Sequence, residues 1–275
     1  MSDMTLKAKT NKNTVARPAA DKLLGNPHIM TFTVLVILIL LWEYLPPALG
    51  VPGYIIPTFS QCIVEMFRMW RQEELLLHLV STFVYTVLGF VVGSALGAFI
   101  GYLLGMSRFW EKVLSPYILA LQIAPKVAFA PLFIMWFGYN SMPKLLVTVL
   151  VVFFPVLVNV LQSIKTVDRD LINLARAYNL SRWQIFIKIE MPSTLPNLMA
   201  GLRIGSTLAV IGVTVGELVG GNTGLGFLIS YGGGQANAAM VFVSIIFLTI
   251  IGIIVYSTLT WVEERVLHYL PRAEH

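Results

Sequence analysis

Two ionisable side chains, Lys126 and Glu217, lie inside long apolar stretches of the sequence. A charged group in hydrocarbon is costly, so such residues usually serve a pathway for polar solutes or a specific structural pair. Glu217 follows Gly216, and it can line or gate a solute path, cap a loop or form an ion pair. Lys126 follows Pro125, and it can attract an anionic solute, extend to the membrane interface or pair with Glu217.

Uncharged amides also interrupt the apolar stretches, at Gln122, Asn159 and Gln162. They are candidates for a pathway or for hydrogen bonds between helices, and both interpretations stay open. The candidate translocation pathway therefore consists of Gln122, Lys126, Asn159 and Glu217.

Motifs for enzymatic chemistry are absent from the sequence. It has no G-x-x-x-x-G-K-[ST] phosphate loop and no H-E-x-x-H zinc motif, and its histidines, at positions 28, 78, 268 and 275, are scattered. A single cysteine, Cys62, excludes an internal disulfide and a cysteine-based metal cluster. We expect no catalytic residue, no metal and no cofactor in this chain.

The composition indicates a membrane protein. Hydrophobic residues make up 57% of the chain and charged residues only 12%, against roughly a quarter in soluble domains, and the mean hydropathy is +0.78. Because the apolar runs do not alternate with polar residues, the spans are expected to be helices rather than barrel strands.

Six apolar segments are long enough to be considered as spans. They predict an all-α polytopic protein with one transmembrane domain over 27–275 and a polar tail over 1–26. The predicted spans are 29–46, 80–104, 115–138, 143–164, 197–220 and 239–262.

Lys and Arg residues gather on one side of these spans. With a cytoplasmic N-terminus, fifteen fall on the cytoplasmic side and three, Arg68, Arg71 and Lys144, on the other. Cytoplasmic segments of membrane proteins carry such an excess, so both termini are expected in the cytoplasm. The net charge of +5 follows from this distribution and does not indicate nucleic-acid binding.

Two further patterns concern helix packing. Phe59, Ile63, Phe67 and Trp70 recur at helical spacing, with Glu65, Arg68 and Arg71 on the other side, which predicts a short helix at the membrane interface. In the second span, glycines at four-residue intervals predict a smooth face for close helix packing. These glycines are Gly89, Gly93, Gly97, Gly101 and Gly105.

The longest polar interruption, 165–196, predicts two short helices. The first is expected from about 168 to 178 and ends at Asn179, since asparagine tolerates the left-handed conformation found after a helix. Ser181 is expected to cap the second helix, with Gln184 completing a capping box.

The second loop helix is expected to end before Pro192 and to present Trp183, Phe186 and Ile187 as an apolar patch. An apolar patch outside the membrane predicts a soluble partner that covers it.

This segment resembles the cytoplasmic EAA loop of bacterial ABC-importer permeases, E-A-A-x-x-x-G followed by an apolar residue and proline. Ala175 matches the second alanine and 189–192 the closing end, whereas Asn173 replaces the glutamate and Asn179 the glycine. The first change removes a charge that could pair with the ATPase, and the second keeps the turn. The neighbouring segments Ser181-Arg182-Trp183-Gln184, Met191-Pro192 and Leu195-Pro196 are also typical of that family.

The resemblance, which extends over about 55–270, implies a type I importer permease of the inner membrane that works by alternating access. It implies a cytoplasmic ATPase dimer that holds ATP and Mg, a periplasmic or lipid-anchored solute-binding protein, surrounding membrane lipid and a second permease copy, most simply a homodimer. The ATPase-coupling residues would be Asn173, Ala175, Tyr178, Asn179, Ser181, Trp183, Phe186 and Pro192.

Residues 123–138 and 216–228 resemble the branch that imports nitrate, sulfonates, taurine, bicarbonate and thiamine-pyrimidine or riboflavin-type heterocycles. Within this branch, residues 209–217 are more similar to the heterocycle importers. Two alternatives remain. An ion-driven secondary transporter would be expected to show two internal repeats, and no convincing repeat is found. An integral-membrane enzyme would need His, Asp or Glu residues clustered at one membrane face, and the histidines are scattered.

Overall fold

A computed structural model describes residues 27–268, and these residues form helices without any strand. The predicted tail over 1–26 lies outside the described residues. The helices that cross or approach the bundle, in chain order, are α2 (Pro27–Ala48), α3 (Phe59–Gln72), α4 (Leu75–Gly105), α5 (Arg108–Ile123), α6 (Ala130–Phe137), α7 (Ser141–Lys165), α8 (Arg169–Ala177), α9 (Arg182–Ile185), α10 (Met191–Gly220), α11 (Leu225–Gly234) and α12 (Ala238–Val266).

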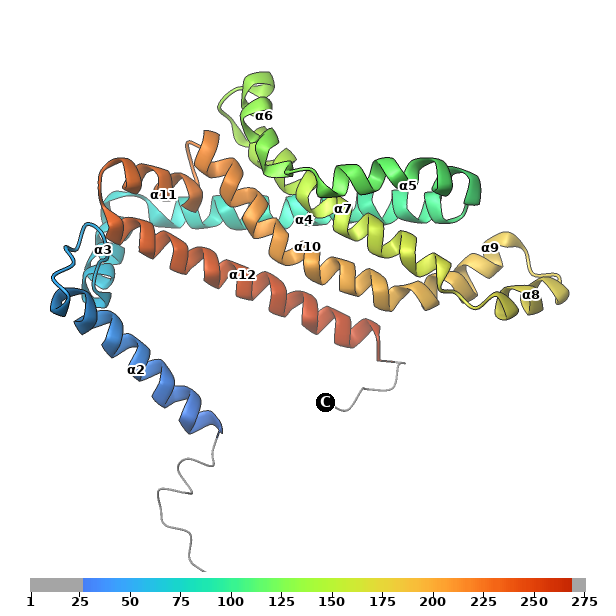
Figure 1. Cartoon of the computed structure of the whole chain (residues 1–275), viewed down its shortest axis with the longest axis horizontal. Coiled ribbons are helices and arrows are strands. Elements are labelled where there is room, and N and C mark those ends of the chain that lie inside the picture. The colour runs from blue at the N-terminus through green and yellow to red at the C-terminus, as the bar shows by residue number, and fades with distance from the viewer. Residues whose placement is uncertain (1–26, 269–275) are drawn as a thin grey trace, which may run out of the picture.

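Within residues 27–268, five helices are long and apolar enough to cross a membrane, and the count rises to six if the bent pair α5–α6 is one span. The long helices α4, α7, α10 and α12 run roughly along the long axis of the molecule, with α3 and α11 at one end and α8 and α9 at the other (Figure 1). The membrane-helix class predicted from composition is confirmed.

Helix α7 is packed between two faces that are rich in glycine. A Cβ atom on Gly97 of α4 would lie 2.6 Å from the Phe153 carbonyl oxygen, and one on Gly216 of α10 would lie 2.5 Å from the Lys144 Cα. The backbones therefore touch on both sides of α7. The packing face predicted for α4 is confirmed, whereas the second face, on α10, was missed. The α10 residues on this second face are Gly201, Gly205, Gly212 and Gly216.

The predicted third span, 115–138, is not one helix. Helix α5 ends at Ile123, and after a bend of 80° the chain continues as a 3₁₀ turn over Lys126–Phe129 and then α6. Pro125 lacks the amide that would continue α5, and the residue before it, Ala124, is extended with ψ 139°. The proline thus explains the break.

The remaining predicted spans all lie within observed helices, but the fifth begins much earlier than 197. Helices α9 and α10 and the π-turn between them run without interruption over Arg182–Gly220, a stretch of 39 residues. The predicted loop over 165–196 is therefore continuous with a span.

Helix α3 begins at a capping box of Thr58 and Gln61 and exposes Phe67 and Trp70, as a helix at the interface would. Glu65 lies on the side opposite the exposed Phe67 and Trp70, as predicted, but at Glu65 this side of α3 faces the fold. The Glu65 side chain is buried, and it accepts hydrogen bonds from Arg68 Nη2 at 2.6 Å and Asn237 Nδ2 at 2.8 Å. These bonds satisfy the carboxylate inside the fold.

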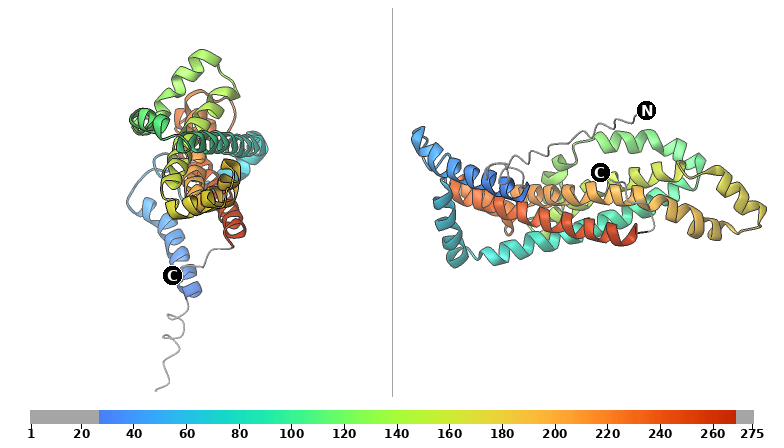
Figure 2. Two further views of the ribbon diagram at one scale, coloured as in Figure 1. Left: turned by 90° about the vertical axis from the view of Figure 1, so that its right-hand side faces the viewer. Right: turned by 90° about the horizontal axis from the view of Figure 1, so that it is seen from below.

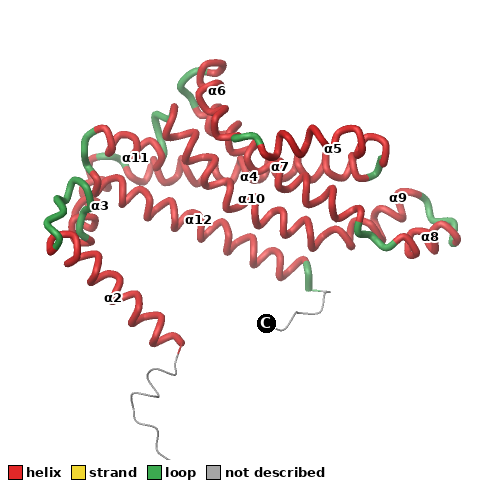
Figure 3. Tube along the Cα trace, viewed as in Figure 1, coloured by secondary structure: helices red, strands yellow, loops and turns green. Residues whose placement is uncertain are grey.

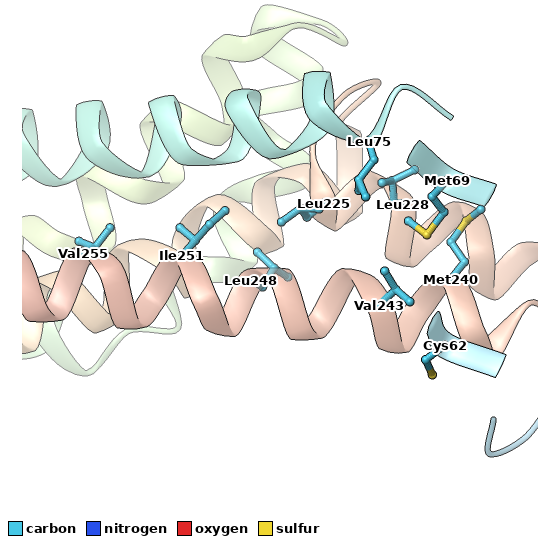
Figure 4. Close-up of a cluster of buried hydrophobic side chains, with 10 residues drawn as sticks. All are labelled: Cys62, Met69, Leu75, Leu225, Leu228, Met240, Val243, Leu248, Ile251 and Val255. Carbon is cyan, nitrogen blue, oxygen red and sulfur yellow. The ribbon is translucent and has the colours of Figure 1, made fainter. Parts of the chain in front are cut away.

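An apolar cluster fastens α3 to the end of the bundle. Figure 4 shows Met69 of α3, Leu75 of α4, Leu228 of α11 and Met240 of α12 close together, and all four are at most 2% exposed. Burial of large apolar side chains stabilises this end, which carries α11 and the 221–224 segment.

Helix α2 stands apart from the bundle and meets it only near its C-terminal end (Figures 1 and 2). The Trp42 Nε1 donates to the Pro57 carbonyl at 2.9 Å, and Ser60 donates to the Glu43 carboxylate. The rest of α2 is apolar and exposed, as expected for a surface in contact with lipid or another membrane helix.

Candidate functional site

The two ends of the helical bundle carry different candidate sites. One end holds the α8–α9 hairpin, drawn as helix and short loop at the right of Figure 3, and the other holds a buried ion pair.

The α8–α9 hairpin has the local geometry that the sequence predicts. Asp168 caps α8 by accepting from the Asp170 amide, and α8 ends at Ala177. Asn179 has φ 57°; its amide donates to the Arg176 carbonyl at 2.9 Å, and the Leu180 amide donates to the Ala175 carbonyl at 3.0 Å. This pair of bonds is a Schellman motif, which reverses the chain at a single left-handed residue.

The second loop helix starts as predicted and ends differently. Ser181 and Gln184 form a reciprocal capping box, which confirms the predicted start. The predicted stop before Pro192 is wrong: a π-turn over Phe186–Glu190 joins α9 to α10, and the Met191 amide donates to the Phe186 carbonyl. The wider turn admits a residue without an amide into a continuous helix.

Exposed apolar side chains lie on the surface of the hairpin, and we call five of them the loop patch. Tyr178 is 74% exposed and Trp183 is 68% exposed, whereas Ala175 and Ile185 are buried. An uncovered apolar surface of this kind marks a contact with another molecule. The loop patch consists of Leu171, Leu174, Tyr178, Trp183 and Ile187.

The hairpin is attached to the spans through Phe186. Its ring lies 5.6 Å from the rings of both Trp183 and Tyr102, and the Tyr102 hydroxyl is 2.5 Å from the Thr194 hydroxyl of α10. Phe186 is partly buried in this contact, so it is not a free part of the patch as the sequence predicted. Asn173, the position of the missing glutamate, is exposed on α8.

At the other end, Glu217 lies in a buried polar network. It is 1% exposed, and its nearest cation is Lys144, with Nζ and Oε1 3.3 Å apart. Thr82 and the Gly226 amide donate to the same carboxylate at 2.9 Å and 3.0 Å. The predicted alternative of a Lys126–Glu217 pair is wrong, and Lys144, counted above as a cation on the outer side, is buried.

This network fixes the segment between α10 and α11. Lys144 Nζ also donates to the Thr223 carbonyl at 3.2 Å, and the Gly224 amide donates to His78 Nδ1 at 2.9 Å. Gly224 has φ 116°, and a Cβ there would lie 2.0 Å from the Glu217 carboxyl carbon. Glu217 therefore closes a loop and forms an ion pair, two of the roles left open above.

Of the other candidate pathway residues, Gln122 and Lys126 lie at the break of the third span, and Asn159 lies in α7. Lys126 Nζ donates to the Gln122 carbonyl at 2.5 Å and lies 5.1 Å from the centre of the Phe154 ring. Asn159 donates to the Pro155 carbonyl at 2.9 Å within α7. The structure thus joins Lys126 with Gln122 and places Glu217 in a separate cluster.

Sequence reasoning missed Lys144 as the partner of Glu217 and Thr82 as a ligand of the pair. These residues come from α7, α10 and α4, and 73 residues separate Lys144 from Glu217. Among residues 27–268 no group of three or more His, Cys, Asp or Glu could hold a metal ion.

The fold and these sites define a multi-pass helical transport protein with a structured loop at one end of its spans. The family model for the inner-membrane component of binding-protein-dependent transport systems matches residues 93–268. The chain belongs to this family, and it is the permease subunit of an ATP-driven importer. Such an importer also includes an ATPase and a solute-binding protein.

Similar proteins agree with this membership. The formylaminopyrimidine transport permease of Halalkalibacterium halodurans is 33% identical over 234 residues, 84% of this chain and 91% of the relative. The riboflavin transport system permease of Chloroflexus aurantiacus is 34% identical over 85% of this chain and 87% of the relative. A putative aliphatic sulfonates transport permease of Bacillus subtilis is 30% identical over 95% of this chain and 94% of the relative.

A solved structure shows the same fold. The chain aligns with a chain of the MetNI methionine ABC transporter, in a structure described as inward-facing, with a TM-score of 0.60 at 18% identity. The alignment covers 73% of this chain and 99% of the other. The predicted all-α importer-permease fold is confirmed.

Proposed function

We propose that this chain forms the membrane pathway of an importer for a small heterocycle of the pyrimidine or flavin type. Relatives named for formylaminopyrimidine and riboflavin transport, at 33% and 34% identity, support this class. A small anion such as a sulfonate or nitrate is the second candidate, because Lys126 places a cation at the break of the third span and relatives named for sulfonates and nitrate also match.

The hairpin over 168–191 is the proposed docking element for the ATPase, which would carry ATP and Mg on its own residues. The observation that carries this proposal is the exposed loop patch on a hairpin closed by Asn179 and joined to α4 through Phe186 and Tyr102. A force on the patch would reach the spans through packed rings and the continuous α9–α10 helix.

Two copies of the chain are proposed to enclose the pathway, with both termini and the loop patch in the cytoplasm of a bacterial cell. In each copy, Gln122, Lys126 and Asn159 would face the solute. Glu217 would act indirectly, by holding the segment that connects α10 with α11 through the Lys144 pair.

Uptake by the reconstituted system tests the proposal. The permease is placed in proteoliposomes with its ATPase inside and its binding protein outside, and radiolabelled riboflavin, a formylaminopyrimidine and an alkanesulfonate are compared. We expect ATP-dependent uptake of a heterocycle that unlabelled sulfonate does not inhibit. Uptake of the sulfonate alone would overturn the heterocycle assignment, and uptake that needs an ion gradient instead of ATP would overturn the whole mechanism.

A further inference from the structure

A cavity of about 410 Å³ lies at the end of the molecule that carries the hairpin. The turn between α4 and α5, the end of α7 and one side of α8 enclose it, and these elements meet at the right of Figure 1. Its volume is within the range of small-ligand sites, which span about 300–1,000 Å³. The walls combine apolar residues with six charged ones, which are Arg108, Glu111, Lys112, Lys165, Arg176 and Glu190.

The charges around this cavity do not cancel. Glu111 is neutralised by Lys165 at 2.6 Å. Arg108, Lys112 and Arg176 form no ion pair with any residue that the structure describes, and the remaining acid, Glu190, offsets only one of them. The cavity therefore keeps a net charge of about +2 by formal count, and an anion would compensate it.

The cavity lies where two apolar helices end, and in a membrane such helix ends meet the lipid headgroups. Spans α4 and α7 end at Gly105 and Lys165, so the basic side chains stand just where the apolar helices stop. On the first turn of α5, Phe109 and Trp110 are 68% and 55% exposed, and aromatic side chains of this kind gather at membrane–water interfaces. Ser107 makes no side-chain cap bond, so the first amides of α5 also favour a negative group.

We propose that this cavity binds the phosphate of an anionic phospholipid headgroup, with Arg108, Lys112 and Arg176 as its charged contacts. The acyl chains would lie along the apolar surface of α5, beside Trp110. Basic pockets between helices at the cytoplasmic face bind anionic headgroups by the same combination of charge and depth. Because the cavity adjoins α8, a bound lipid would stabilise the hairpin at the end that joins the spans.

Native mass spectrometry of the detergent-purified permease–ATPase complex tests the site, with dioleoyl phosphatidylglycerol and dioleoyl phosphatidylcholine as probes. We expect phosphatidylglycerol to bind more tightly than phosphatidylcholine. Arg108→Gln and Lys112→Gln should each weaken phosphatidylglycerol binding about fivefold, the effect of one basic residue near a membrane surface. A control pair, Arg71→Gln with Arg265→Gln, removes exposed cations that lie outside the cavity.

Four results would overturn the inference. Equal binding of the two lipids would remove the requirement for an anion, and equal losses in the cavity variants and the control pair would remove the site. Displacement of bound phosphatidylglycerol by millimolar inorganic phosphate would assign the same contacts to a free anion instead of a lipid headgroup. Retained binding in the folded Arg108→Gln/Lys112→Gln double variant, with its ATPase still attached, would likewise contradict it.

Discussion

At the scale of single residues, Asn179 determines the shape of the hairpin. Its φ of 57° is unfavourable for a β-branched residue, at a cost of about 1–2 kcal/mol or more. Asn179→Val should therefore disturb the turn and reduce the amount of ATPase that co-purifies with the permease several-fold, without loss of membrane insertion. Asn179→Gly, which accepts the same φ, is the matched control. If valine and glycine variants retain equal amounts of ATPase, the turn does not matter for docking.

Lys144 and Glu217 form the second residue-scale test, because an unpaired charge in the interior is far more costly than a missing pair. Lys144→Met should lower the free energy of unfolding by about 3–5 kcal/mol, since it leaves the carboxylate buried without its cation. Adding Glu217→Gln should restore part of this loss. Thermal unfolding of the single and double variants in detergent measures the coupling, and additive losses would contradict a direct interaction.

The thiol of Cys62 should be unreactive toward thiol reagents in the folded chain. Burial raises the pKa of its thiol to about 11, and the negative charges of Glu43 and Glu65 act in the same direction. At pH 8, therefore, only about one thiol in a thousand is the reactive thiolate. We expect negligible maleimide labelling of the native chain at pH 8, labelling that increases toward pH 11, and complete labelling after denaturation. Rapid labelling of the folded chain at pH 8 would show that α3 does not bury this thiol.

At the scale of elements, the packing of α7 against α4 depends on the absence of side chains. In Gly97→Ala the new Cβ would lie 2.6 Å from a backbone oxygen that cannot rotate away, so we expect a loss of about 1–3 kcal/mol. Gly233→Ala in α11 is the control, since nothing lies within 4 Å of a Cβ there. Scanning calorimetry should show a lower unfolding temperature for Gly97→Ala alone; equal temperatures would contradict close packing.

The elements also show which features of the fold can be predicted from sequence. Asn179, Ser181 and Gln184 were predicted correctly because caps and turns depend on residues within a few positions of one another. The bend at Pro125 was missed because the hydropathy of 115–138 is continuous, although the proline itself was visible. The π-turn before Pro192 was missed because this proline was taken to end the helix, whereas the helix continues through it.

The buried site was less predictable than the hairpin. Glu217 was recognised as unusual from its apolar neighbours, but its partner was not, because Lys144 stands at the start of a span and looks like an ordinary interfacial lysine. Likewise, the spacing placed Glu65 opposite the apolar residues of α3, but its partner Asn237 could not be foreseen, because the two residues become neighbours only in the folded chain. Long-range pairs of this kind leave no local pattern in a single sequence.

At the scale of the whole molecule, the two candidate sites lie at opposite ends of the same helices. The continuous α9–α10 helix begins at the hairpin and ends at Gly220, beside the segment that Glu217 holds. A change of hairpin orientation would therefore be transmitted along 39 residues of helix to the far end of the pathway. This arrangement suits an importer in which a cytoplasmic ATPase drives alternating access.

The most direct test removes the contact surface and leaves the hairpin folded. The variant Tyr178→Ala/Trp183→Ala truncates the two most exposed side chains of the loop patch, and both bound ATPase and ATP-driven uptake are measured in the same proteoliposomes. We predict that both fall together by about tenfold, equivalent to about 1.4 kcal/mol of binding free energy, while the amount of inserted permease stays constant. Undiminished ATPase binding and uptake in this variant would contradict the role of the hairpin as the docking element.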